Sequence, residues 1–385
     1  MTMRYRTLGK TGLKVSEIGF GGEWLERHPE EESVELMKYA SEKGINIIDC
    51  WMPDPKSRDI IGKAMKGNRE NWFVQGHFGA NWHEGQYVRS REMKYVRPSF
   101  EDLLTRLQTD YIDLGLIHYV DTVEDWNALQ GSDYMKYVME MKENGTIRHI
   151  GMSSHDPKTA ATAVRSGLIE MLLFSVNPAF DMLPSGQDLD ELLGDGFHYD
   201  DRLAGINTER AQLYMLCEEY DVGITVMKGF AGGRLFDKNR SPFGVELTPV
   251  QCIHYALSRL GVDSVLCGFD TKEQVDEAVH YEEASESEKD YASVLGNAPL
   301  HSYRGECTYC GHCKPCVANL DIAMINKFYD LATIQPEVPE SVRSHYLSLE
   351  RKASECVGCR QCEARCPFGV PIADRMTKAA ELFGE

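Results

Sequence analysis

Short apolar runs alternate with longer segments of helical periodicity from Ser16 to His280. The short runs are bounded by turn-forming residues, which predicts buried strands. These predicted strands are Ser16–Phe20, Ile45–Asp49, Phe73–His77, Ile112–His118, His149–Ser153, Met171–Asn177, Gly223–Met227 and Ser264–Cys267. A segment with apolar residues three and four apart follows each strand and predicts an amphipathic helix. The predicted helices are Glu31–Lys43, Ser57–Met65, Pro98–Leu107, Tyr134–Asn144, Pro157–Ser166, Glu209–Tyr220, Pro249–Leu260 and Lys272–His280, with Thr208 and Thr248 as N-caps.

This strand–helix rhythm is typical of an α/β fold, and its length and repeat favour a (β/α)8 TIM barrel. A doubly wound open sheet is the alternative. It is disfavoured because no G-x-G-x-x-G turn follows the first strand, and Gly19-Phe20-Gly21-Gly22 does not match that spacing.

Two runs of cysteine follow the repeating region. The first is Cys307, Cys310, Cys313 and Cys316, and the second is Cys356, Cys359, Cys362 and Cys366, followed by Pro367. The second run has the spacing with which bacterial ferredoxins hold [4Fe–4S] clusters, where the fourth cysteine of a run reaches the other cluster. We therefore expect Cys307, Cys310, Cys313 and Cys366 on one cluster, and Cys356, Cys359, Cys362 and Cys316 on the other.

Zinc is the competing interpretation of closely spaced cysteines, and disulfides are disfavoured by the C-x2-C spacing. The first run is one residue shorter than the second before its last cysteine, and Val317 replaces the proline. The predicted organisation is a barrel over residues 1–285 and a small, α-rich, ferredoxin-like domain with two [4Fe–4S] clusters over residues 286–385, with the acidic stretch Glu282–Lys289 as the junction.

The net charge of −19 argues against nucleic acid and against an anionic membrane surface as partners. No apolar stretch is long enough to span a bilayer. Free thiols and iron–sulfur clusters fit a reducing, oxygen-poor cytoplasm, so a cytoplasmic protein is expected.

Several motifs resemble the aldo-keto reductase family. They are Gly44-Ile45-Asn46-Ile47-Ile48-Asp49, Gly62-Lys63-Ala64-Met65, Arg148-His149-Ile150-Gly151-Met152-Ser153, and Gly223–Lys228 running into Ala231–Leu235. Together with the cysteine runs, the whole chain resembles the aldo-keto reductase–ferredoxin fusions of anaerobic bacteria and archaea. The resemblance implies a (β/α)8 barrel that binds a nicotinamide without a Rossmann domain.

The catalytic residues depart from that family. Reductases of the aldo-keto reductase family use four catalytic residues, an Asp, a Tyr, a Lys and a His. Asp49 matches the family Asp, and His118 matches the family His. Asp54 stands at the tyrosine position and His77 at the lysine position. The candidate catalytic group is therefore Asp49, Asp54, His77 and His118. Three interpretations remain open: acid–base catalysis by His77 or Asp54, a divalent metal at the barrel site, and a degenerate barrel that has lost catalysis.

The resemblance also implies a set of nicotinamide-binding residues: Ser153, Asn177, Lys228, Gly232, Arg234, Gly268 and Gln274. Asp270 lies where a basic residue often binds the 2′-phosphate, and Ala278 replaces an adenine-binding Asn. NADP(H) is thus disfavoured, while NAD(H), or no nicotinamide at all, is left open.

Together these features predict an iron–sulfur oxidoreductase that acts on a small carbonyl or polyol substrate. Its clusters would relay electrons to an external carrier, a ferredoxin or a flavoprotein. The alternatives are a lyase or isomerase with structural clusters and a non-catalytic electron-transfer subunit.

Overall fold

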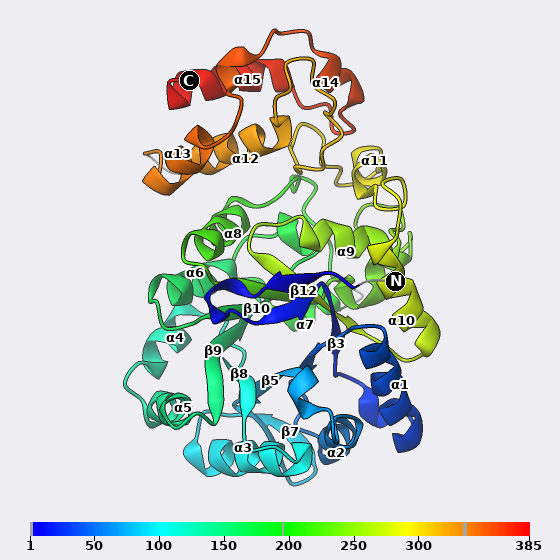
Figure 1. The fold of residues 1–385 in the computed structure, drawn as a ribbon, viewed down its shortest axis with the longest axis vertical. Helices are drawn as coiled ribbons and strands as arrows, with labels where there is room; N and C mark the ends of the chain where they lie inside the picture. Colours follow the sequence, from blue (N-terminus) through cyan, green and yellow to red (C-terminus); the bar gives the residue numbers. More distant parts are fainter. Residues whose placement is uncertain (1–2, 195, 334–336) are drawn as a thin grey trace.

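The computed structural model describes residues 3–194, 196–333 and 337–385. Eight parallel strands close into a barrel in the order β10-β11-β12-β3-β4-β5-β8-β9 (Figure 1). They are β3 (Ile18–Gly21), β4 (Ile47–Cys50), β5 (Phe73–Phe78), β8 (Ile112–Ile117), β9 (Ile147–Ser154), β10 (Met171–Ser175), β11 (Gly223–Met227) and β12 (Val262–Gly268). The predicted barrel is confirmed, and each strand overlaps its predicted segment.

Helices follow the strands and surround the barrel. They are α1 (Glu30–Glu42), α2 (Pro55–Ala64), α3 (Met93–Leu107), α4 (Val123–Leu129), α5 (Asp133–Glu143), α6 (Pro157–Arg165), α7 (Leu189–Leu193), α8 (Thr208–Glu219), α9 (Pro249–Leu257) and α10 (Lys272–Val279). Thr248 caps α9 as predicted, in a reciprocal pair of hydrogen bonds with Gln251.

The starts of α8 and α3 differ from the prediction for reasons that their contacts explain. Asn207, not Thr208, caps α8, because the Asn207 side chain accepts a hydrogen bond from the backbone N–H of Glu209 at 2.9 Å. Helix α3 begins at Met93 and runs through Pro98, where we expected it to begin. Its buried face, which includes Val96 and Phe100, packs on the barrel on both sides of the proline, so packing outweighs the lost hydrogen bond.

Apolar side chains from several strands fill the barrel interior. Ile47, Leu114, Leu116, Met171, Leu173 and Leu266 form one buried cluster there, together with Leu8 and Val15. Val15 lies on the antiparallel hairpin of β1 (Tyr5–Thr7) and β2 (Lys14–Ser16), and Leu8 follows β1. This hairpin therefore closes the amino-terminal end of the barrel and leaves the carboxyl-terminal end for a site.

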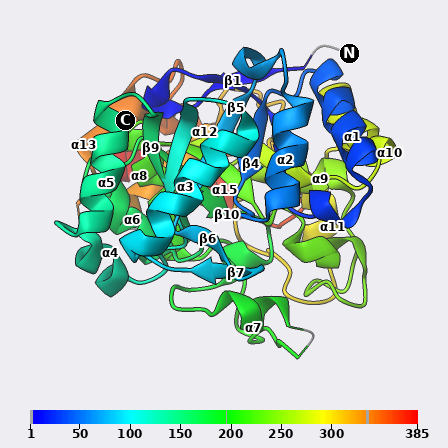
Figure 2. The ribbon, with the colours of Figure 1, turned by 90° about the horizontal axis from the view of Figure 1, so that it is seen from below.

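A second hairpin lies at the other end of the barrel. Strands β6 (Ala80–His83) and β7 (Gln86–Arg89) pair directly after β5. Figure 2 shows this hairpin and α7 on one side of the barrel, opposite β1. The loops that follow β5 and β10 thus extend from the carboxyl ends of the strands.

The C-terminal region is helical and packs against the flank of the barrel, not over its mouth (Figures 1 and 2). It contains α11 (Tyr291–Gly296), α12 (Ile322–Thr333), α13 (Glu340–Leu347), α14 (Gln361–Arg365) and α15 (Ile372–Phe383). Helix α12 contacts α8 of the barrel as well as α13 and α15. The boundary between residues 285 and 286 stays a prediction.

Buried polar groups join this region to the barrel. The Tyr303 hydroxyl donates to the carbonyl of Pro178 at 2.6 Å, just after β10. The Arg259 guanidinium, on the barrel side, donates to the carbonyl of Thr308 at 3.0 Å, next to the first cysteine. Because these groups are buried and paired, they fix the helical region on the flank. No helix in the described ranges is long and apolar enough to cross a membrane.

Candidate active site

Three side chains from adjacent strand ends form a line of hydrogen bonds at the barrel mouth. His77 Nε2 lies 2.8 Å from Asp49 Oδ1, and His77 Nδ1 lies 2.9 Å from His118 Nδ1. All three residues are buried, with 4–5% of their surface exposed. The sequence placed all three at strand ends, and the structure brings them together.

Strand alternation explains this convergence. Side chains two residues apart along a strand face the same way, so Ile47 and Asp49 both point inward, as do Leu114, Leu116 and His118. In β4 and β8 the lower inward positions are apolar, and the last inward position supplies Asp49 or His118, whereas in β5 both Gln75 and His77 are polar. Gly22 lets the first two barrel strands approach here, because a Cβ on it would lie 2.4 Å from the Asp49 carbonyl oxygen.

The line continues to a tyrosine of the β6–β7 hairpin. The Tyr87 hydroxyl lies 2.9 Å from His118 Nε2. The Trp51 ring stacks on His118 at 6.2 Å between centroids and meets Tyr87 edge-on at 5.7 Å. The contact between Tyr87 and His118 was not predictable, because it depends on how the β6–β7 hairpin folds back over the mouth.

The surroundings of these groups shift their acidity. Burial lowers the pKa of His118 well below its usual value, and the neighbouring His77 and Arg91 add to the effect. Burial also raises the pKa of Tyr87, while Arg89 and Arg91 oppose that rise. His118 is therefore a neutral imidazole at pH 7.

Asp54 does not join this line among the described residues. It is the N-cap of α2, and its carboxylate accepts a hydrogen bond from the Ser57 N–H at 3.0 Å. This local role accounts for an Asp directly before Pro55, which is a favourable first residue of a helix.

Glu23 is a mouth residue that the sequence did not indicate. Burial raises the pKa of its carboxyl, Lys228 opposes the rise, and Asp49 adds to it. Glu23 follows the carboxyl end of β3, which pairs with the β4 strand that carries Asp49. A carboxylate directly after a Gly-Gly turn at a strand end was the available signal.

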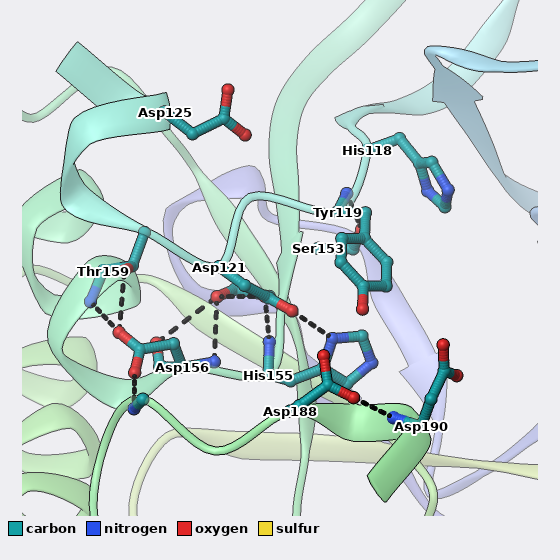
Figure 3. Close-up of polar contacts among 12 residues, drawn as sticks. His118, Tyr119, Asp121, Asp125, Ser153, His155, Asp156, Thr159, Asp188 and Asp190 are labelled. Atoms are coloured by element: carbon teal, nitrogen blue, oxygen red, sulfur yellow. Dashed lines mark hydrogen bonds and ion pairs between the residues drawn. The ribbon is translucent and has the colours of Figure 1, made fainter. Parts of the chain in front are cut away.

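A second polar cluster lies next to His118 (Figure 3). His155 Nδ1 lies 2.9 Å from Asp121 Oδ2, and the Tyr119 ring lies beside both His118 and His155. Burial raises the pKa of Asp121, but hydrogen bonds from His155 and Ser154 outweigh it and leave that pKa lowered. Burial raises the pKa of Tyr119 to about 12, and Asp121, Asp190 and Asp188 add to the rise. Figure 3 shows that Asp188 and Asp190, from the α7 segment, lie next to this cluster.

The residues expected at a nicotinamide make contacts within the protein. Ser153 Oγ accepts from the N–H of Tyr119 at 2.8 Å. The Asn177 side chain donates to the carbonyl of Lys228 at 2.9 Å and accepts from the N–H of Phe180 at 2.8 Å. Ser153, Asn177 and Lys228 thus lie at strand ends. The Asn177 side chain joins the backbone after β10 to the backbone after β11.

The other predicted cofactor residues lie on the loops after β11 and β12. Arg234 donates to the carbonyls of Leu193 and Gly194 at 3.2 and 2.6 Å, which ties it to the end of α7. Gly232 precedes it with a φ of 65°, and the exposed Gly268 ends β12. Gln274 accepts from the N–H of Asp270 at 2.7 Å.

The eight C-terminal cysteines fall into two groups of four. Cys307, Cys310, Cys313 and Cys366 line one cavity, here called the barrel-side cavity, together with Thr308. Cys316, Cys356, Cys359 and Cys362 line a second, called the outer cavity. These are the two sets expected from the spacing. A cluster in either cavity stays a prediction.

Within the described ranges, no three His, Cys, Asp or Glu side chains are arranged to hold one metal ion. Four sulfurs on one zinc ion would lie within about 4.6 Å of one another, twice the Zn–S distance of about 2.3 Å. The cysteine sets are therefore not preformed single-ion sites. At the mouth, the ring nitrogens of His77 and His118 bind each other, Asp49 and Tyr87, so these residues do not fit the alternative of a divalent metal.

Comparison with known proteins gives one family. The model of the aldo/keto reductase family matches residues 17–248, which end before the first cysteine run. The aldo-keto reductase YhdN of Bacillus subtilis is 31% identical over 161 residues, 40% of this chain and 47% of that protein. The chain spans about half the length of the curated relatives it matches.

Solved structures share the fold. The aldo-keto reductase AKR11C1 from Bacillus halodurans in its holo form covers 75% of this chain and 94% of its own, with a TM-score of 0.58 and 23% identity. An aldo-keto reductase from Klebsiella pneumoniae in complex with NADPH covers 74% and 91%, with a TM-score of 0.50 and 17% identity.

Proposed function

Because the chain belongs to the aldo/keto reductase family, we propose that it is an iron–sulfur oxidoreductase acting on a small carbonyl or polyol substrate. The barrel mouth binds the substrate beside the Asp49–His77–His118 line. Two [4Fe–4S] clusters in the C-terminal region relay electrons between the barrel and an external carrier, a ferredoxin or a flavoprotein, in a reducing cytoplasm.

The division of the cysteines carries this proposal. Two sets of four thiols, each drawn from both runs, line separate cavities whose other walls are largely apolar, such as Leu320, Ile322 and Met376 in the outer one. Thiolates hold [4Fe–4S] clusters, and an apolar shell protects such a group from solvent. Oxidation of an alcohol to a carbonyl releases two electrons and two protons, and two one-electron clusters together have the capacity for those two electrons.

The cavities differ in their access to solvent and to the barrel. In the outer cavity, Cys359 is exposed, and Val317 and Val357 beside it are 61% and 67% exposed. The barrel-side cavity includes Thr308, whose carbonyl binds Arg259 of the barrel. This order supports a path from the carrier through the outer cluster and then the barrel-side cluster.

Nicotinamide use is a separate part of the proposal. NAD(H) is favoured over NADP(H), because Asp270 presents a carboxylate where a 2′-phosphate would lie and pairs with His28 at 2.8 Å. When bound, the nicotinamide supplies or accepts a hydride, and Ser153, Asn177, Lys228, Gly232, Arg234, Gly268 and Gln274 are the residues proposed to hold it.

Anaerobically purified protein tests the proposal. We expect about eight iron and about eight sulfide ions per chain. A short polyol substrate should bleach the cluster absorbance, and dithionite should bleach it in the absence of substrate. Two zinc ions per chain with no labile sulfide would refute the iron–sulfur part, and full clusters that no polyol or carbonyl can reduce or oxidise would refute the catalytic part.

A further inference from the structure

The hydrogen bonds at the mouth form one unbroken line of four groups. The line runs from Tyr87 Oη through the rings of His118 and His77 to the Asp49 carboxylate. The three successive hydrogen-bond distances are 2.9, 2.9 and 2.8 Å. Gln75 also donates to Asp49 Oδ1 at 3.0 Å and so holds that carboxylate in place. Each imidazole therefore uses both of its nitrogens within the line.

With both imidazoles neutral, the chemistry of the groups sets one direction for these bonds. The Asp49 carboxylate only accepts, so His77 Nε2 carries a hydrogen. With His77 neutral, its Nδ1 accepts, and His118 Nδ1 must then donate. His118 is neutral because of its surroundings, so its Nε2 is a bare acceptor and the Tyr87 hydroxyl donates to it.

Exposure distinguishes the end of the line that meets a substrate. Tyr87 is 38% exposed, whereas His118 and His77 are 5% and 4% exposed. Tyr87 is therefore the member of the line that solvent reaches, while Trp51 and Tyr87 pack against the buried His118 ring.

We propose that Tyr87 is the catalytic acid–base of this site and that His118, His77 and Asp49 are the positioning residues that carry its proton. The proposal rests on the proposed oxidoreductase function. It assigns to the β6–β7 hairpin the phenol that the chain lacks at position 54.

The step balances for alcohol oxidation. The substrate O–H proton moves to the Tyr87 oxygen, as the tyrosine proton moves to His118 Nε2. The His118 Nδ1 proton passes to His77 Nδ1, and the His77 Nε2 proton passes to Asp49, which becomes neutral. The carbinol C–H bond breaks as the C=O bond forms, and an oxidised nicotinamide, when bound by Asn177, Lys228 and Arg234, would accept the hydride that leaves. Carbonyl reduction reverses each transfer.

Tyr87→Phe tests the assignment, because it removes only the hydroxyl. We expect NAD⁺-dependent oxidation of glycerol or 1,2-propanediol to fall by about 10²–10⁴-fold, the usual effect of losing an acid–base group. Tyr95→Phe is the control. Tyr95 lies on α3 beside His83, away from the line, and the control should retain the wild-type rate. Equal rates in wild type and Tyr87→Phe would overturn the role of Tyr87 and leave the proposed function standing.

A spectroscopic measurement tests the line without turnover. In protein labelled with ¹⁵N-histidine, His118 should carry its hydrogen on Nδ1, and its Nε2 resonance should move in Tyr87→Phe but not in Tyr95→Phe. The His118→Gln variant assigns the signals. A His118 tautomer with its hydrogen on Nε2 would overturn the proposal. If no polyol is oxidised by the wild type, the proposed function fails while this measurement still decides the line.

Discussion

Burial keeps the His118 imidazole neutral, and this makes the free energy of unfolding depend on pH. Its pKa is near 6.5 in the unfolded chain and well below that in the fold. The unfolded state therefore binds the extra proton below about pH 6.5, and stability falls as the pH falls through this range.

We expect this residue to cost about 1.4 kcal/mol of unfolding free energy per pH unit below about pH 6.5, until the folded pKa is reached. Urea unfolding at pH 7 and pH 5 measures it, and His118→Gln should lose less stability than the wild type between these pH values. His83→Gln, at a half-exposed position, is the control. An unchanged pH dependence in His118→Gln would contradict the cause.

Residue types at strand ends were predictable, but their partners were less so. The end of a predicted strand is a local feature of the sequence, so it indicated Asp49, His77 and His118. The contact of Tyr87 with His118 depends on how a hairpin folds back over the mouth, which no local pattern encodes. For Asp54 the prediction came from the family resemblance, which suggested a catalytic role. The local sequence Asp54-Pro55 instead forms the N-terminal cap of α2.

Helix α7 is held at the mouth by a residue of another loop. Arg234 binds the carbonyls of Leu193 and Gly194, and the resemblance implies that the same residue helps to bind the nicotinamide cofactor, which carries phosphate groups. A charged phosphate binds a guanidinium more strongly than a neutral carbonyl does. Cofactor binding and the position of α7 should therefore be coupled.

Arg234→Met should speed amide exchange at 189–194 and leave the barrel strands protected, because only the loop contacts are lost. NADH binding to the wild type should also speed exchange of the amides at 189–194, but by less than Arg234→Met does. Hydrogen–deuterium exchange with mass spectrometry measures both effects. Arg202→Met is the control, since Arg202 is exposed and pairs with Asp200. Exchange that is unaffected at 189–194 in Arg234→Met would show that the arginine does not hold the helix.

The helical region and the barrel are joined through groups far apart in the chain. The spacing alone indicated which cysteines share a cavity. In runs of this spacing, the fourth cysteine of each run is expected to join the first three of the other run. The flank position was not predictable, since it depends on contacts such as Tyr303 with Pro178. Such long-range contacts leave no periodic signal in the sequence.

Single cysteine variants test the exchange between the runs. Cys316→Ser should lose the same cluster as Cys359→Ser, and Cys366→Ser the same one as Cys310→Ser. Iron content should fall by up to about half in each, and electron paramagnetic resonance of the reduced protein identifies the remaining cluster. Thermal unfolding of the barrel should change little. If Cys316→Ser instead matched Cys310→Ser, each run would hold its own cluster.

The shared cysteines also set an order of maturation. Three thiols of the barrel-side cavity are made first, but the fourth, Cys366, comes after all of the outer set. Neither cavity is complete until the second run has been synthesised, and both are then completed within that one run. If the cavities hold the proposed clusters, neither cluster can be completed before the second run is made, and both would then be completed at nearly the same stage of synthesis.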